Sequence, residues 1–145
     1  MLDALTSARA PQRPAGLPSS SWQTLIARTQ ALIARPELAM FFSDERYTAA
    51  HNEVEFALPD GTVGRIDRLV EHADVIWVLD YKTGAPDPVA LDTYAAQLSR
   101  YRQALTQIRP DKPIRAALLL DDATLLELAD GRFMGHQPGP HHPFL

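Results

Sequence analysis

The chain has 145 residues, of which 46% are hydrophobic and 22% are charged, and its formal net charge is -4. This length suits one domain with a core of moderate size, and the acidic balance argues against a module that binds DNA by overall positive charge, although a local basic groove remains compatible with it. The absence of cysteine excludes disulfides and thiolate metal sites and suits the cytoplasm, where we expect the protein. No apolar run is long enough to span a membrane, and no secretory pattern begins the chain, so a membrane is not an expected partner.

The first third of the chain changes character near residue 21. Residues 1–20 contain three prolines without a sustained period, which predicts a linker or disordered arm. Apolar residues at helical spacing then predict a helix over 22–35, which ends before Pro36 because the residue preceding proline avoids the α region. A second, short helix is expected over 36–42.

The rest of the chain predicts a sheet interrupted by one long helix. Alternating apolar residues and turn signals predict five strands and a helix, at residues 52–58, 62–70, 74–80, 91–108 (the helix), 113–120 and 123–129. This order suits an α/β (α+β) domain with a central mixed β-sheet flanked by helices. We expect one domain over 21–130 and an irregular tail over 131–145.

Charged residues end a strand that is otherwise apolar. Residues 75–79 read VIWVL, and Asp80, Tyr81 and Lys82 follow them. Because every position of the run is apolar, both faces of the strand are expected to be covered, as in a central strand. Residues two apart in a strand share a face, so Asp80 and Lys82 point the same way.

A second aspartate is expected opposite the first. If the hairpin turn centres on Ala73 and Asp74, Asp67 lies directly across from Asp80, where side chains share a face at about 4.5–5.5 Å between Cβ atoms. Two bare carboxylates in that position repel each other, but a divalent cation turns the repulsion into affinity. Such a cation activates water for phosphodiester hydrolysis, and Lys82 beside it neutralises developing negative charge.

A purely structural interpretation competes with this one. Asp80 and Lys82 could form an ion pair at a strand end, and Asp67 could pair with Arg65 or Arg68. The spacing of these residues is compatible with both interpretations.

Three further segments make a family resemblance specific. The stretches GRIDRLV (64–70) and VLDYKTG (78–84) are followed by a helix that carries Gln97 and Tyr101 in the pattern QLxxYxxAL. Together they closely resemble the PD-(D/E)xK nuclease superfamily, and most of all the RecB-like nuclease domain at the C-terminus of the AddA and RecB helicase-nucleases. The resemblance runs from about residue 36 to 128 and implies a restriction-endonuclease-like core of αβββαβ order.

The resemblance also implies roles. Asp67 and Asp80 are similar to the metal-binding acids, Lys82 to the catalytic lysine, and the backbone carbonyl of Tyr81 to a further metal ligand. The ion implied is Mg²⁺, with Mn²⁺ as a possible substitute. Gln97 and Tyr101 are expected to contact DNA or support the site, although Tyr101 also lies on the apolar stripe of its helix. Glu53 is expected to be structural or to support the site.

These roles predict a Mg²⁺-dependent deoxyribonuclease, of exonuclease type, that acts in double-strand break repair with a helicase portion or partner subunit. Family members of this kind carry a further metal ligand on an upstream helix, but residues 22–35 contain no His, Asp or Glu. The domain is therefore expected to be incomplete at its N-terminus. An alternative is a catalytically weak domain of the same fold that binds DNA or docks a subunit, and a third is an unrelated α/β domain with structural ion pairs.

Overall fold

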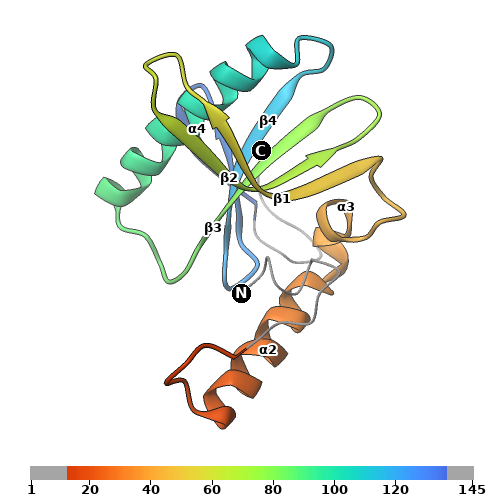
Figure 1. Ribbon diagram of the computed structural model, residues 1–145, viewed down its shortest axis with the longest axis vertical. Helices are drawn as coiled ribbons and strands as arrows, with labels where there is room; N and C mark the ends of the chain where they lie inside the picture. The colour runs from red at the N-terminus through yellow and green to blue at the C-terminus, as the bar shows by residue number, and fades with distance from the viewer. Residues whose placement is uncertain (1–12, 137–145) are drawn as a thin grey trace.

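A computed structural model describes residues 13–136 and places six strands in one sheet with helices on either side (Figure 1). In chain order the elements are α2 (Ser19–Ile33), η1 (Pro36–Leu38), α3 (Ala39–Phe42), β1 (Ala49–Ala57), β2 (Val63–Glu71), β3 (Ile76–Lys82), α4 (Pro88–Ile108), β4 (Ile114–Leu120), β5 (Leu125–Ala129) and β6 (Arg132–His136).

The strands lie in the sheet in the order of the sequence, from β1 to β6. Neighbouring strands are antiparallel except β3 and β4, which run parallel and are connected by α4. A parallel pair needs such a long crossover, whereas antiparallel strands can be joined by tight turns. The sheet is therefore mixed and flanked by helices, as the sequence predicted, and is compatible with a restriction-endonuclease-like fold.

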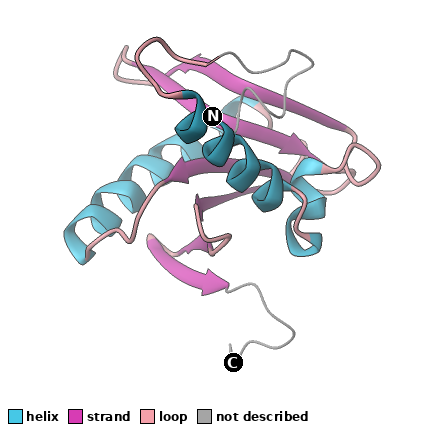
Figure 2. Cartoon of the chain, turned by 90° about the horizontal axis from the view of Figure 1, so that it is seen from below, coloured by secondary structure: helices cyan, strands magenta, loops and turns pink. Residues whose placement is uncertain are grey.

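Each face of the sheet has its own core. One core lies beneath α4 and gathers apolar residues from α4 and from β2, β3 and β4, including Leu98, Ile66, Val78 and Leu118. The other lies beneath the segment from α2 to α3, where Leu32, Leu38 and Phe41 pack on residues such as Trp77 and Leu119. Figure 2 shows the helices on the two sides of the strands.

Strand β3 is buried from Ile76 to Asp80, because both cores cover it. Its even-numbered apolar residues, Ile76 and Val78, join the core beneath α4, and its odd-numbered ones, Trp77 and Leu79, join the core beneath α2 and α3. The apolar run thus belongs to a central strand. Asp80 follows in the same alternation and lies on the α4 side.

The chain turns sharply from the end of β3 into α4. Gly84 has a φ of 74°, a left-handed conformation that glycine adopts without steric cost. Asp87 then caps α4, because its side chain accepts a hydrogen bond of 2.8 Å from the amide of Ala90. This turn fixes where α4 begins relative to Lys82.

Two boundaries differ from the sequence prediction. Residues 132–136 form β6, which pairs with β5, so the expectation of an irregular tail from 131 is wrong over this stretch. β6 has only five residues, RFMGH, which are too few for a clear apolar alternation, and only pairing with β5 reveals it as a strand. Helix α2 begins at Ser19 within the expected arm over 1–20, of which residues 1–12 lie outside the described part of the chain. Within residues 13–136, no helix has the length and apolar character to cross a membrane.

Candidate functional site

The pairing of β2 with β3 brings two aspartates to the same end of the hairpin. The paired residues run from Glu71 and Ile76 beside the turn to Arg68 and Leu79, which is the register predicted from the sequence. One step beyond the last pair, Asp67 faces Asp80. The backbone pairing of β2 with β3 ends at Arg68 and Leu79, so backbone groups beyond that pair need other partners.

The side chain of Asp67 supplies one such partner. Its Oδ2 accepts a hydrogen bond of 2.8 Å from the backbone amide of Tyr81. The same carboxyl group is close enough to Asp80 to raise the pKa of the Asp80 carboxyl group. The two acids therefore point toward one another across β2 and β3.

Asp80 is a buried acid with an altered pKa. Its residue is 8% exposed, and burial raises its pKa from an ordinary 3.8 to about 7, with the hydrogen bond and the charge of Asp67 acting in the same direction. The nearby ammonium of Lys82 opposes this shift but does not outweigh it. At neutral pH the Asp80 carboxyl group therefore readily holds a proton, which a cation could replace.

Lys82 completes the group on the α4 side of β3. Its Nζ lies 3.1 Å from Asp80 Oδ2 and 4.7 Å from the centre of the Tyr94 ring on α4. Burial favours a lower pKa for Lys82, but the attraction of Asp80 and smaller contributions from Tyr94 and Asp67 together raise it above its ordinary value. Lys82 is therefore a fixed positive charge at this end of β3.

The oxygen atoms at this end of β3 suit a hard divalent cation. Oδ2 of Asp80 is buried and accepts no well-aligned hydrogen bond, although Lys82 Nζ is close to it. Buried polar atoms normally have partners, and carboxylate oxygens are the ligands that Mg²⁺ prefers. Residues 13–136 contain no group of three or more His, Cys, Asp or Glu side chains that could hold a metal ion. The side-chain ligands for a cation at this site are therefore the two acids, Asp67 and Asp80.

Gln97 and Tyr101 lie on the face of α4 that turns toward the sheet. Gln97 Nε2 donates a hydrogen bond of 3.0 Å to Tyr101 Oη, and Tyr101 is buried with its ring edge-to-face against Phe56 at 5.3 Å. A Cβ on Gly64 would lie 2.7 Å from Phe56 and 3.0 Å from Tyr101, so the hairpin of β1 and β2 packs closely here. Tyr101 is thus part of the core, and its hydroxyl orients Gln97.

Glu53 lies beside the aspartates in sequence register but turns its carboxylate elsewhere. Its neighbours Asn52 and Val54 pair with Arg68 and Ile66, so Glu53 faces Asp67 across β1 and β2. Its φ is 53°, a strained conformation for a residue with a side chain, and its carboxylate forms a 2.6 Å ion pair with Arg65. The structure places Glu53 next to the site backbone, with its charge already paired.

The arginines considered as partners for Asp67 have other contacts. Arg65 pairs with Glu53, so it does not neutralise Asp67. Arg68 is 3% exposed and donates to Phe41 O and Asn52 Oδ1, so it does not pair with Asp67. Its burial follows from the core beneath α3, which the spacing of charges in the sequence does not show.

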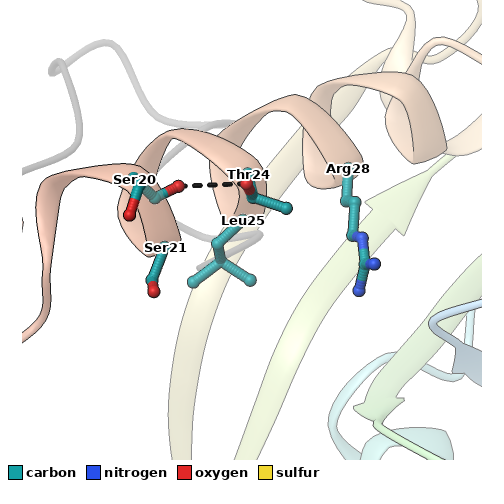
Figure 3. Close-up of a pocket in the computed structure, with 5 residues that line it drawn as sticks. All are labelled: Ser20, Ser21, Thr24, Leu25 and Arg28. Atoms are coloured by element: carbon teal, nitrogen blue, oxygen red, sulfur yellow. Dashed lines mark hydrogen bonds between the residues drawn. The ribbon is translucent and has the colours of Figure 1, made fainter.

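A groove opens at the same ends of the strands, on the side of the sheet that α2 covers. It has a volume of about 650 Å³ and lies between α2 and the ends of β3 and β4, lined by Leu25, Arg28, Thr29, Ala31, Leu32, Arg35, Tyr81, Lys82, Thr83, Leu119, Leu120, Asp121 and Asp122. A second hollow of about 420 Å³ lies along α2 alone, around Ser20, Ser21, Thr24, Leu25 and Arg28 (Figure 3). This second hollow contains none of the acids at the end of β3, so it has no part in the chemistry of that site.

Tyr94 is the site neighbour that sequence reasoning did not single out. In the sequence it is one apolar position on the stripe of the long helix. Its position three residues before Gln97 and seven before Tyr101 places all three on one helix face, which is the signal that could have found it. Only the packing of α4 over β3 shows that it reaches Lys82.

The family model of the PD-(D/E)XK nuclease superfamily matches residues 1–139 of the chain. The chain therefore belongs to this superfamily, and it is a nuclease domain. A search of curated proteins finds no match to the chain.

Proposed function

We propose that the chain is a metal-dependent deoxyribonuclease domain that uses Mg²⁺, or Mn²⁺ in its place, to hydrolyse phosphodiester bonds. The observation that carries the proposal is the buried Asp80 carboxyl group held against Asp67, with the Lys82 ammonium 3.1 Å away. A folded chain that keeps two acids in contact gives up stability for it, because like charges repel at close range. A cation between them would convert that cost into binding.

Each residue then has a separate task. Asp67 and Asp80 would hold the cation together with the backbone carbonyl of Tyr81. When bound, the cation supplies an acidified water and polarises the scissile phosphate. Lys82 places a positive charge where the phosphate oxygens become more negative and where a hydrogen-bond donor can orient the water.

Gln97, Tyr101 and Glu53 act around this centre. Tyr101 is anchored in the core and accepts a hydrogen bond from Gln97, which leaves the Gln97 amide in a fixed orientation for the DNA backbone. Glu53 supports the strand segment that faces Asp67, through its ion pair with Arg65. Variants of Gln97 and Tyr101 should therefore change substrate affinity more than the chemical step.

The broader role that we propose is end-resection during double-strand break repair, by an exonuclease of the RecB-like type that works in the cytoplasm with a helicase portion or partner subunit. Its support is the resemblance of the segments 64–70, 78–84 and 97–105 to that branch of the superfamily. Linear DNA with labelled ends and closed circular DNA distinguish the exonuclease from an endonuclease.

The direct test is cleavage of linear and circular DNA by the full chain with Mg²⁺, with Mn²⁺ and with a chelator. We expect metal-dependent cleavage that falls about a thousandfold in Lys82→Ala and in Asp67→Asn. Glu71→Gln is a matched control, because it changes a carboxylate at the other end of the β2–β3 hairpin. Equal cleavage by the wild type, Lys82→Ala and Asp67→Asn would remove the assignment.

A second candidate keeps the fold without the chemistry. Residues 13–136 hold no third acidic or histidine ligand beside Asp67 and Asp80, which favours a domain that binds DNA or docks a subunit and holds metal weakly. Calorimetry separates the two. Retained DNA affinity without any Mg²⁺ or Mn²⁺ binding would favour the second candidate, whereas metal binding that Asp80→Asn abolishes would favour the nuclease.

A further inference from the structure

The ammonium of Lys82 has two different kinds of partner. One is the Asp80 carboxylate at 3.1 Å, and the other is the face of the Tyr94 ring, whose centre lies 4.7 Å from Nζ. A cation within about 6 Å of an aromatic centre is attracted by the negative face of the ring. The Lys82 side chain is 29% exposed, so the contact is partly shielded from water.

We infer that Tyr94 is a positioning residue that holds Lys82 in place when a divalent cation occupies Asp67 and Asp80. The inference rests on the proposed function. A bound cation draws on the charge of Asp80 and repels the Lys82 ammonium, so the ion pair that holds Lys82 in the free protein weakens. A lysine side chain has four flexible bonds and would otherwise swing into solvent.

The ring is suited to this task because it attracts an ammonium without attracting the metal ion away from the carboxylates. The Tyr94 ring is partly buried against the core beneath α4. Its helix is fixed at its start by the Asp87 cap. Tyr94 also shares a helix face with Gln97 and Tyr101, so one side of α4 provides the lysine support together with the two residues proposed to act around the site.

The first test is a double-mutant cycle on cation binding, measured by calorimetry with Mn²⁺ and without DNA. Tyr94→Leu should weaken Mn²⁺ binding roughly three- to tenfold, because the ring contributes more once the carboxylates are occupied. Lys82→Met removes the ammonium that competes with the metal ion and should strengthen binding. In the Lys82→Met background, Tyr94→Leu should then have no effect.

The second test observes the contact itself. The ε-methylene protons of Lys82 should show an upfield ring-current shift by NMR, which Tyr94→Phe retains and Tyr94→Leu removes. In cleavage assays Tyr94→Leu should lower kcat roughly tenfold, with little change in KM, and Tyr94→Phe should restore most of the loss. Leu91→Ala is the matched control, because Leu91 packs one turn earlier on α4 against the same core.

The outcomes separate the inference from the function on which it rests. Equal weakening of Mn²⁺ binding by Tyr94→Leu with and without Lys82, or an equal loss of kcat in Leu91→Ala, would overturn the positioning role while the nuclease assignment stands. A wild type that binds no Mn²⁺ and cleaves no DNA would instead overturn the proposed function.

Discussion

The two ends of the β2–β3 hairpin place a carboxylate in opposite electrostatic environments. Beside the turn, Glu71 accepts hydrogen bonds from Arg109 at 2.9 Å and from Lys112 at 2.7 Å, and these partners lower its pKa from 4.5 to about 2. At the open end, burial and the proximity of Asp67 raise the pKa of Asp80 to about 7. The same pair of strands therefore carries one stabilised anion and one destabilised anion.

The difference distinguishes a charge that stabilises the fold from a charge that is available to a ligand. Two cations surround Glu71, so its charge is matched within the protein. Asp80 has one cation and one competing acid, so its negative charge is only partly matched. Residues with such perturbed pKa values gather at functional sites, because the missing charge can come from a ligand.

The largest expected effect is on cleavage. Asp80→Asn should lower Mg²⁺-dependent DNA cleavage about a thousandfold, because it removes one of the two acids that would hold the cation. Glu71→Gln should stay within about threefold of the wild type, since Glu71 lies at the far end of the hairpin. Initial rates on end-labelled linear DNA measure both, and equal losses in the two variants would contradict the comparison.

Stability should respond in the reverse direction. Glu71→Gln should lower the free energy of unfolding by about 1–3 kcal/mol, because it leaves Arg109 and Lys112 with a weaker acceptor. Asp80→Asn should raise it by about 1–2 kcal/mol at pH 8, because a buried charge becomes neutral, with some loss from the Lys82 pair. Urea titrations monitored by tryptophan fluorescence and circular dichroism measure both. Destabilisation by Asp80→Asn would show that its charge is matched after all.

The pH dependence of stability separates the two acids further. Glu71 binds its proton more weakly in the folded than in the unfolded state, so its contribution is present above pH 4.5 and is lost as pH falls toward 2. Asp80 binds its proton more tightly when folded, so its contribution favours the fold at low pH and is lost as pH rises from 3.8 through about 7.

Unfolding measured across this pH range should therefore show two opposite slopes in the wild type. Glu71→Gln should reduce the rise between pH 2 and 4.5, to which Asp111 also contributes, and Asp80→Asn should reduce the fall between pH 4 and 7. Identical curves for Asp80→Asn and the wild type above pH 4 would mean that Asp80 has an ordinary pKa.

The smallest expected effect concerns the neutral hydrogen bond beside the site. Tyr101→Phe removes the acceptor of Gln97 Nε2 and should lower the free energy of unfolding by about 0.5–1.5 kcal/mol. If Tyr101 orients Gln97 for DNA, the same variant raises KM more than it lowers kcat. A KM equal to that of the wild type, with the expected loss of stability, would restrict Tyr101 to the core.

Local patterns were sufficient for much of this fold. The alternation and turn signals predicted β1 to β5 and α4 to within a few residues, because a half-buried strand and an amphipathic helix leave distinct periods in the sequence. The hairpin turn also gave the register that places Asp67 opposite Asp80, since antiparallel pairing follows from turn position. Strand β6 was missed, because its pairing partner rather than its own pattern defines it.

By itself, the sequence determined that a central strand ends in Asp80 and Lys82, that Asp67 lies across from them, and which superfamily those segments resemble. Only the tertiary structure decided that Arg68 is buried beneath α3, that Glu53 is paired with Arg65, and that Tyr94 reaches Lys82. The reason is physical. Register and periodicity depend on neighbours along the chain, whereas burial, charge matching and ring contacts depend on how α3 and α4 pack against the sheet.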